Sequence, residues 1–452
     1  MVEHYQPVGS TATEICASVE TGVRTGALAP GAALPPVRVL AATLAVSPAT
    51  VAKAYQVLRQ RGIVHTDGRR GTRIRPRTPV AELGPRSDPM PPPAPDGLLD
   101  LATGEPDPRL LPSIPTHLAS LAHTLDADGY TPGYADAGPL PALTELARER
   151  FAATGLLPAP VTVTSGALDG IERLLRGQLR PGDRVAVEDP GWANLLDLVA
   201  ALGLTAVPMP VDDHGPTESG LRRALAAGAR AVVVTTRAQN PTGAAVSAPR
   251  ADALRGLLRA SPDVLLVEDD HAAELSDAPA RPLAGATTHW AFVRSVSKPY
   301  GPDLRVALLT GDEATVSRIE GRMRIGSGWV STLLQHLVVR LWRDPTVAAT
   351  VTSAADSYRR RRTALRAALG EHGVASHGGS GINVWVPVTD ETWAVGQLQA
   401  EGYLVAPGSR YRLDSAAGVR ITISRLDDDA MAALAQAVHR AVRPPSRRPI
   451  GR

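Results

Sequence analysis

The sequence contains 48 basic residues, yet only two of them are lysines, Lys53 and Lys298. Arginine can replace lysine as a surface charge, but its guanidinium stays protonated and cannot condense with an aldehyde as an amine does. Any chemistry that needs a side-chain amine is therefore restricted to two positions. Lys298 stands in SVSK, residues 295–298, directly after the stretch HWAFVR.

Cysteine and long apolar stretches are also scarce. The single cysteine, Cys16, excludes an internal disulfide and is typical of a protein from a reducing compartment. There is no uninterrupted apolar run of membrane-spanning length, and the first residues, MVEHYQP, lack the basic-then-apolar pattern of a signal peptide. We therefore expect a cytoplasmic protein without a membrane partner.

The charge is distributed unevenly along the 452 residues, a length that predicts two or three domains. Residues 1–80 carry ten Lys/Arg against four Asp/Glu, a balance of +6, whereas the remainder carries 38 against 41, a balance of −3. A basic head on a nearly neutral body indicates a polyanionic partner for the head alone.

A proline-rich linker separates head and body. The segment Pro76–Asp96 has eight prolines in 21 residues, which is incompatible with helix or sheet and typical of a semi-rigid extended spacer. At ~3.1 Å per residue it can reach roughly 60 Å. We predict a head over residues 1–75, a linker over 76–97, a body over 98–442 and a basic tail over 443–452.

The head has the pattern of a winged helix-turn-helix. Helical spacing of apolar residues predicts helices over about 11–25 and 37–44. A third helix is expected to begin with Ser47 as N-cap and Pro48 at its first position. In that helix Val51, Tyr55 and Leu58 form an apolar face. Residues 63–74, which contain the glycine-flanked pair of arginines 69 and 70, read as a β-hairpin wing.

The stretch LPPVRVLAATLAVSPATVAKAYQVLRQRG, with the wing after it, resembles the GntR family of bacterial regulators. The resemblance implies binding to a double-stranded DNA operator, with the second helix of the motif in the major groove. It assigns DNA contacts to Arg38, Thr50, Lys53, Arg69 and Arg70. Family members usually carry arginine where this chain has Pro48, so one DNA contact of the family is missing.

The body alternates between predicted strands and helices, which indicates an α/β domain with a largely parallel sheet covered on both faces. Strands are expected at 161–164, 184–187, 231–235, 264–267, 292–295 and 304–309. Helices are expected over 167–179 and after the turn 189–192. In such sheets ligands bind beyond the carboxyl ends of the strands, where polar residues gather in this sequence.

The types of these polar residues match one cofactor. Lys298 offers an amine for an aldehyde, and Asp269 at a strand end can keep a pyridine nitrogen protonated. Ser165 and Gly166 stand at a helix N-terminus, which favours phosphate, and Arg305 can neutralise that phosphate. Two further side chains suit the ring: Trp192 for stacking and Asn240 for a hydrogen bond to a ring hydroxyl.

The motifs EDPGWAN, QNPTG, VEDDH and SVSKPYGPDLR together resemble the fold-type I, aspartate-aminotransferase-like domains that bind pyridoxal 5′-phosphate. The resemblance implies that Lys298 forms the Schiff base, that Ser295 helps to hold the phosphate, and that Arg420 receives a substrate carboxylate. It also implies that Tyr134 reaches the phosphate of a neighbouring subunit, which makes the protein a homodimer. No metal site is expected.

One position departs from the aminotransferase pattern. His271 stands where a tyrosine usually contacts the ring hydroxyl. Histidine can donate a hydrogen bond there, but its ordinary pKa is nearer neutrality. Efficient transamination is therefore not expected, although a half-reaction remains open.

The fusion of the two domains resembles the MocR subfamily of GntR regulators, and the phrases RAQNPTG and HWAFVRSVSKPYGPDLR resemble its PtsJ-like branch, which is tied to vitamin B6 salvage. The leading hypothesis is a transcription factor whose effector is pyridoxal phosphate, alone or as an adduct with an amine or amino acid. One alternative is a working aminotransferase with an appended DNA-binding head. Another is a DNA-binding dimer whose body has lost the coenzyme.

Overall fold

The structure is a computed structural model that describes residues 5–60, 63–66, 71–75, 97–127, 129–130, 133–134 and 138–443. Most of the expected linker (76–96), most of the expected tail (444–452), and both wing arginines, Arg69 and Arg70, lie outside the described residues.

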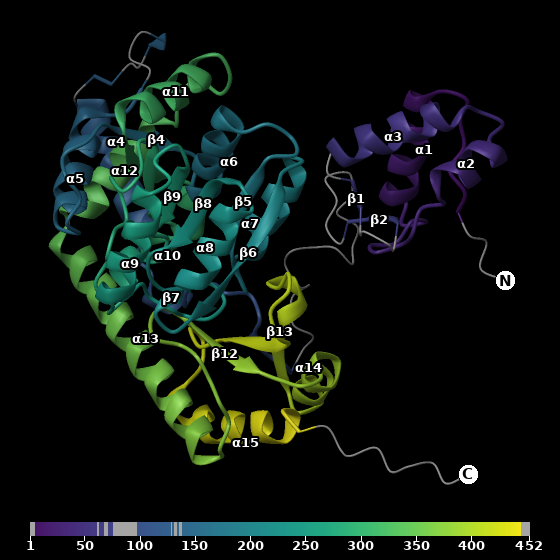
Figure 1. The fold of residues 1–452 in the computed structure, drawn as a ribbon. Helices are drawn as coiled ribbons and strands as arrows, with labels where there is room; N and C mark the ends of the chain where they lie inside the picture. The colour runs from purple at the N-terminus through teal and green to yellow at the C-terminus, as the bar shows by residue number, and fades with distance from the viewer. Residues whose placement is uncertain are drawn as a thin grey trace. The chain divides into compact units, whose positions relative to one another are not determined.

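The larger part is built on an eight-stranded sheet (Figure 1). In spatial order its strands are β4 (Val161–Thr164), β11 (Ala307–Gly311), β10 (Trp290–Ser295), β9 (Leu265–Asp269), β8 (Ala229–Thr235), β5 (Arg184–Asp189), β6 (Thr205–Asp212) and β7 (Gly215–Pro216). Strands β8, β9 and β10 run parallel, whereas β11 pairs antiparallel with both β10 and β4. The expected α/β fold is confirmed.

Five of the six predicted strands lie where the sequence placed them, but the sixth begins later than predicted. We expected it from Leu304, and β11 begins at Ala307. Pro302–Leu304 instead forms the 3₁₀ turn η5, and Arg305 after it has a left-handed backbone with φ 45°. The proline and the left-handed residue interrupt an extended run that hydrophobicity alone predicts to be continuous.

A second, four-stranded sheet has the order β12 (Asn383–Pro387), β14 (Gly418–Thr422), β13 (Tyr403–Pro407) and β3 (Leu99–Leu101). The 27-residue helix α13 (Pro345–Glu371) extends from the large sheet to this small one (Figure 1).

The other helices among the described residues of this part are α4 (Ile114–Ala127), α5 (Pro141–Ala152), α6 (Ala167–Gln178), α7 (Ala193–Ala201), α8 (Glu218–Ala226), α9 (Ala248–Arg259), α10 (Ser297–Tyr300), α11 (Glu313–Arg324), α12 (Thr332–Arg343), α14 (Glu391–Ala400) and α15 (Met431–Ala441). Short 3₁₀ turns are η2 (Pro108–Leu110), η4 (Ala273–Leu275), η6 (Gly408–Arg410) and η7 (Asp428–Ala430).

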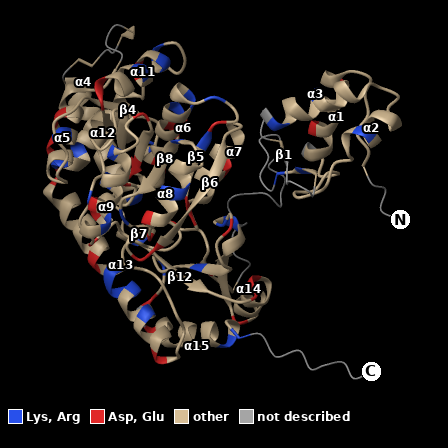
Figure 2. Ribbon diagram, viewed as in Figure 1, with Lys and Arg blue, Asp and Glu red and all other residues tan. Residues whose placement is uncertain are grey.

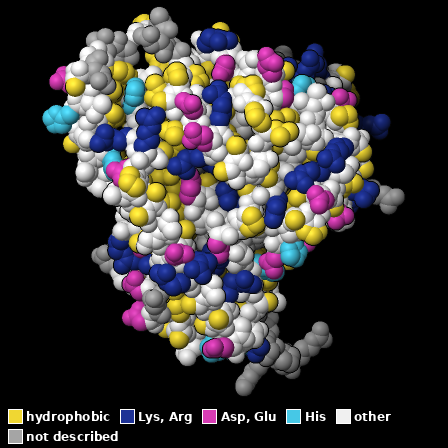
Figure 3. Space-filling model, turned by 90° about the vertical axis from the view of Figure 1, so that its left-hand side faces the viewer, with side chains coloured by type: hydrophobic (Ala, Val, Ile, Leu, Met, Phe, Trp, Pro, Cys, Tyr) yellow, Lys and Arg dark blue, Asp and Glu magenta, His cyan; other side chains and the backbone are white. Residues whose placement is uncertain are grey.

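Charges of both signs are mixed on this part of the protein. Helix α13 carries both basic and acidic residues (Figure 2). On the face drawn in Figure 3, basic and acidic side chains gather in the same band. The exposed pair Arg359–Asp356, at 3.1 Å, is one example on α13. Within the described part of the chain, no single helix is long and apolar enough to cross a membrane.

The N-terminal part contains three helices and a two-stranded hairpin, as predicted. The helices are α1 (Ala12–Arg24), α2 (Val37–Thr43) and α3 (Pro48–Gln60), and the hairpin pairs β1 (Val64–Thr66) with β2 (Thr72–Ile74) in antiparallel fashion. The chain turns by 119° between α2 and α3, which is the geometry of a helix-turn-helix. Ser47 caps α3 as predicted, because its Oγ accepts the Thr50 N–H at 3.1 Å.

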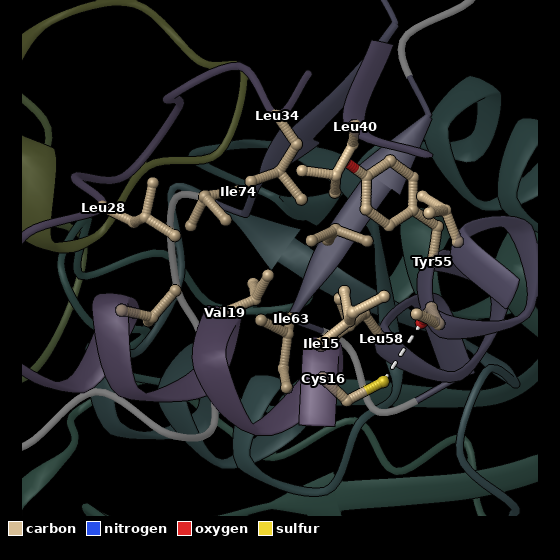
Figure 4. Packing of buried hydrophobic residues seen from close by; sticks show 14 of the residues in the cluster. Ile15, Cys16, Val19, Leu28, Leu34, Leu40, Tyr55, Leu58, Ile63 and Ile74 are labelled. Carbon is tan, nitrogen blue, oxygen red and sulfur yellow. Dashed lines mark hydrogen bonds between the residues drawn. The ribbon is translucent and has the colours of Figure 1, made fainter. Parts of the chain in front are cut away.

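The apolar sides of these helices enclose a small core (Figure 4). Val51, Tyr55 and Leu58 are each at most 1% exposed, which confirms the predicted inner face of α3. Tyr55 donates its hydroxyl hydrogen to the Pro35 carbonyl at 2.7 Å. The thiol of Cys16 is buried and donates to the Ala54 carbonyl at 3.3 Å. The core fixes α3 and leaves its other side in solvent.

Candidate functional site

The candidate site is built where three parallel strands end side by side. In the registers of these strands, Thr235 of β8 lies opposite Asp269 of β9, and Asp269 lies opposite Val293 of β10. The residues after each strand therefore leave the sheet at one edge. Asn240 follows β8, His271 follows β9 and Lys298 follows β10.

Lys298 is held in a buried position on the short helix α10. Its Nζ donates a hydrogen bond to the carbonyl of Gly104. Burial, reinforced by the positive charge of Arg420, lowers the pKa of the Lys298 amine to about 8. A larger fraction of this amine is neutral near physiological pH than is usual for lysine, and only the neutral amine is a nucleophile.

Asp269 is 2% exposed, and only one of its two carboxylate oxygens has a hydrogen-bond partner among the described residues. Its Oδ2 lies 2.9 Å from Nδ1 of His271, while Oδ1 is buried without a hydrogen-bond partner among the described residues. A buried acceptor without a donor is costly, so Oδ1 is suited to a donor from a ligand. The prediction for His271 was a hydrogen bond to the ring hydroxyl; the bond observed here joins it to Asp269.

Arg305 and Gly166 pack against one another at the start of α6. Arg305 Nη2 donates to the Ser165 carbonyl at 3.2 Å. Gly166 has φ +98°, and a Cβ built on it would lie 2.7 Å from Arg305 Nη2. The guanidinium thus occupies space that only glycine leaves open. On β10, Ser295 Oγ accepts the Ser297 N–H at 3.2 Å.

Arg420 on β14 is 4% exposed and faces the same region as Lys298. Its Nη1 donates to Asn240 Oδ1 at 3.1 Å and its Nη2 donates to the Ala102 carbonyl. Its Nε is buried without a partner among the described residues. Burial lowers the pKa of Arg420, which shows how poorly solvated this charge is. The side chain can therefore accommodate a carboxylate.

Gln239, part of the QNPTG motif, has a structural role that the motif alone does not indicate. Gln239 Nε2 donates to the Pro190 carbonyl at 2.8 Å and to Glu188 at 3.2 Å, and its Oε1 accepts from the N–H of Thr242 at 3.0 Å. Glu188 also accepts from Thr235, through N–H and hydroxyl. This buried group, the Gln239 clamp, joins the turn before Trp192 to the turn that contains Asn240.

A buried ion cluster behind the strand ends was also missed. Asp270 is 0% exposed and accepts hydrogen bonds from Arg237 Nε and Arg294 Nη2, both at 2.7 Å. Burial works against the charge of Asp270, but the two arginines hold its pKa below the ordinary value. The cluster connects the ends of β8, β9 and β10. Its three charged residues, of which the first and last are 57 positions apart, leave no local signal for it in the sequence.

The two remaining predicted coenzyme residues are Trp192 and Tyr134. Trp192 is half-buried in the turn before α7. Tyr134 is 90% exposed, and its ring meets that of Trp329 edge to face at 5.8 Å, beside a cavity of about 450 Å³. Such an exposed aromatic side chain is suited to contact with another chain.

The expected DNA contacts lie on the outer side of α2 and α3. Arg38 and Lys53 are exposed, and Thr50 is partly buried with its hydroxyl 2.8 Å from Ser47 Oγ. Arg69 and Arg70 of the wing lie outside the described residues. Among the described residues, no group of three or more His, Cys, Asp or Glu side chains is arranged to hold a metal ion.

Comparison with known proteins decides the family. Residues 11–74 match the model for bacterial regulatory proteins of the gntR family, and residues 96–438 match the model for aminotransferase class I and II. The vitamin B6 salvage pathway transcriptional repressor PtsJ of Salmonella typhimurium is 40% identical over 438 residues, which cover 96% of this chain and 99% of that protein. The chain belongs to the MocR subfamily of GntR transcriptional regulators.

Other MocR-type relatives are more distant. The pyridoxine biosynthesis transcriptional regulator PdxR of Corynebacterium glutamicum is 33% identical over 273 residues, 59% of this chain and 57% of that protein. TauR of Rhodobacter capsulatus is 28% identical and covers 88% of this chain and 89% of that protein. All three relatives have names that state regulation of transcription.

Solved structures support the fold of the MocR body. A kynurenine aminotransferase from Pyrococcus horikoshii has a TM-score of 0.68 at 20% identity, over 77% of this chain and 91% of that chain. An aspartate aminotransferase mutant from Thermus thermophilus has a TM-score of 0.66 at 24% identity, over 76% and 91%. The body therefore has the fold of class I and II aminotransferases, a family that depends on pyridoxal phosphate.

Proposed function

We propose that this MocR protein is a homodimeric transcription factor that binds operator DNA through its head and senses pyridoxal 5′-phosphate through its body, alone or as an adduct with an amine or amino acid. We propose further that it acts on genes of vitamin B6 metabolism, as the name of its 40% identical relative suggests. The observation that carries the proposal is the buried Oδ1 of Asp269, which has no hydrogen-bond partner within the described ranges and belongs to the same site as the amine of Lys298.

The residues present fit the coenzyme. The orphaned Asp269 Oδ1 would accept from the pyridine nitrogen, and His271 would orient that carboxylate. The cradle formed by Gly166 and Arg305 would take the phosphate, together with Ser165 and Ser295. Trp192 would cover the ring, Asn240 would contact the ring hydroxyl, and Tyr134 would reach the site of the partner subunit.

Pyridoxal phosphate, when bound, supplies an aldehyde that a lysine amine can hold reversibly. The chain prepares for it in two ways. Burial keeps the Lys298 amine partly neutral, so that it can attack the aldehyde near pH 8. Arg420 keeps a guanidinium with a free Nε in the same region, where it would receive the carboxylate of an amino-acid effector.

In the head, the exposed side of α3 would enter the major groove with Thr50 and Lys53, while Arg38 on α2 and the wing arginines 69 and 70 would contact the DNA beside it. Phosphate contacts would supply most of the affinity and would make it strongly dependent on salt.

The deciding experiment measures the affinity of the full-length protein for the DNA upstream of its own gene, at one fixed salt concentration, with and without pyridoxal phosphate. We expect a change of about five-fold or more, the usual lower range of allosteric coupling. The matched variant Lys298→Ala should bind the same DNA with an affinity that no longer responds. An unresponsive wild-type protein that binds the coenzyme would contradict the sensor function.

A second candidate function is supported by Arg420 and Asn240. Arg420 Nη1 donates a hydrogen bond to Asn240 Oδ1 at 3.1 Å at the site, an arrangement that would suit an enzyme acting on amino acids. In that case the protein would catalyse transamination. Steady-state turnover of an amino donor and a keto acid, faster than free coenzyme and lost in Lys298→Ala, would favour the enzyme. A single half-reaction without turnover would fit the sensor.

A further inference from the structure

The first described segment after the linker lies against the candidate site. We name residues Leu99–Asp107 the strap. It begins with β3, which pairs in parallel with β13 from Leu99 opposite Tyr403 to Leu101 opposite Val405. The Leu99 N–H also donates to the Gly402 carbonyl at 2.8 Å. The chain then leaves the small sheet and crosses the site before reaching η2.

Two carbonyl groups of the strap are hydrogen-bonded to the two basic side chains of the site. Arg420 Nη2 donates to the carbonyl of Ala102, and Lys298 Nζ donates to the carbonyl of Gly104. Gly104 has φ +69°, and a Cβ built on it would lie 2.9 Å from Arg420 Nη2. The strap backbone therefore lies in direct contact with the groups that we assign to the aldehyde and the carboxylate.

The far end of the strap is firmly attached to the body. Ser424 Oγ donates to the Glu105 carbonyl, and Arg425 donates to the Glu105 side chain at 3.1 Å. Asp107 is 1% exposed; its N–H donates to Tyr358 Oη at 2.8 Å, and its carboxylate accepts from Arg361 at 3.2 Å. A displacement of the strap is therefore absorbed mainly at residues 99–104, the end that continues into the linker.

Ligands compete with the strap for the same donors. Condensation of the neutral amine of Lys298 with an aldehyde would replace its two N–H bonds by a C=N bond, and the aldehyde oxygen would leave as water with both hydrogens. The nitrogen of the neutral product would have no hydrogen for Gly104. A carboxylate on Arg420 forms charge-assisted hydrogen bonds, which are stronger than a bond to the neutral carbonyl of Ala102.

We propose that the strap is the coupling element of this protein: occupation of Lys298 and Arg420 releases the carbonyls of Gly104 and Ala102, loosens β3, and so changes how the linker leaves the body. This inference rests on the proposed sensor function and adds the route by which the site reaches the head. Because the strap enters the linker directly, no other element has to move.

The first test is amide hydrogen exchange of the full-length protein with and without pyridoxal phosphate. We expect faster exchange at Leu99 and Ala102 when the coenzyme is present, and unchanged exchange in β12, which serves as the internal control. Lys298→Ala should show no change in the strap. Equal or slower exchange of the strap in the loaded wild-type protein would overturn the proposal.

The second test separates the strap from the sensor function. A flexible Gly-Ser-Gly-Ser insertion after Gly97, which is exposed and has no neighbour within 4 Å of a built Cβ, lengthens the connection without touching the site. The same insertion after Gly373, also exposed and open, is the control. We expect the Gly97 variant to bind coenzyme normally and to reduce the effect of coenzyme on DNA affinity from about five-fold or more to less than about two-fold.

The outcomes are distinct. If the wild-type protein binds coenzyme but its DNA affinity does not respond, the proposed function fails. If the wild-type and the Gly373 variant respond and the Gly97 variant responds equally, the sensor stands and the strap proposal is wrong. Loss of coenzyme binding in the Gly97 variant would also contradict it, because all the anchors of the strap lie beyond the insertion.

Discussion

Nδ1 of His271 lies 2.9 Å from Oδ2 of Asp269, and the other oxygen of that carboxylate is buried with no hydrogen-bond partner in the part of the chain that the structure describes. His271 therefore fixes the orientation of Asp269 and leaves Oδ1 for a ligand. We expect His271→Leu to weaken binding of pyridoxal phosphate about ten-fold or more, because a hydrogen bond to a charged group contributes roughly 1.5–3 kcal/mol. Titration of the coenzyme into the protein checks this. His271→Asn, whose amide can donate the same bond, is the control, and equal affinities for all three proteins would contradict the orienting role.

The pH dependence of coenzyme attachment follows from Lys298. Burial and then Arg420 lower the pKa of this amine to about 8, so its reactive neutral form predominates above that pH and is lost as the pH falls below it. The rate of covalent attachment, followed by absorbance after mixing, should rise with pH and level off above about 8. Arg420→Gln removes the smaller cause and should move the midpoint upward. A rate that still increases through pH 10 would show that the amine is not perturbed.

Gly166 should be essential for phosphate binding. In Gly166→Ala the new methyl group would lie 2.7 Å from Arg305 Nη2 at a φ of +98°, so both the backbone and the guanidinium must shift. We expect affinity for pyridoxal phosphate to fall about ten-fold or more, and affinity for pyridoxal, which has no phosphate, to change little. Gly256→Ala on α9, where nothing lies within 4 Å of the added carbon, is the matched control. An equal loss for both ligands would argue against a phosphate cradle.

The proposed homodimer predicts a role for the exposed hydrophobic residues near Tyr134. Ile325 at the end of α11 is 87% exposed and Tyr134 is 90% exposed. Burying them against a second copy would remove apolar area from water. Ile325→Glu should raise the dimer dissociation constant about ten-fold or more, measured by sedimentation at several concentrations. Leu157→Glu, at a side chain that is 83% exposed and borders a different cavity, should leave it unchanged. If both variants stay fully dimeric, this surface is not the interface.

Lys53 lies on the exposed side of α3 and should contact either a phosphate of the DNA backbone or the edge of a base. If it contacts a phosphate, Lys53→Ala should reduce the slope of log K against log salt by about 0.9 and weaken all sequences alike. If it contacts a base, the slope should change little and discrimination between operators should fall. Arg259→Ala on α9, which removes an equal charge from an exposed position of the body, controls for net charge. Unchanged affinity and slope would remove Lys53 from the interface.

Much of the fold follows from local patterns in the sequence. The cap at Ser47 and the inner face of α3 depend on residues three or four apart, and the strand ends that carry Asp269 and Lys298 depend on short apolar runs. Both the class of the fold and the two-domain composition were predicted for this reason. The start of β11 was predicted wrongly because the hydrophobic run hid the left-handed backbone of Arg305.

The arrangement inside the site could not be predicted to the same extent. The bond between Arg420 and Ala102 joins residues 318 positions apart, and that between Lys298 and Gly104 joins residues 194 apart. Such pairs are created by tertiary packing, which leaves no periodicity or spacing in a single sequence. The chemical types of Lys298, Asp269 and Arg305 indicated a coenzyme site, but not that His271 bonds to Asp269.

The Gln239 clamp has a consequence for what mutation can change in this domain. Its hydrogen bonds to Glu188, Pro190 and Thr242 are buried and fix two turns from behind, out of reach of a ligand. The shape of the pocket is thus maintained by one set of residues and its reactivity by another. In a protein built in this way, single replacements among the reactive residues can change catalytic turnover while the buried clamp keeps the two turns, and with them the shape of the pocket, in place.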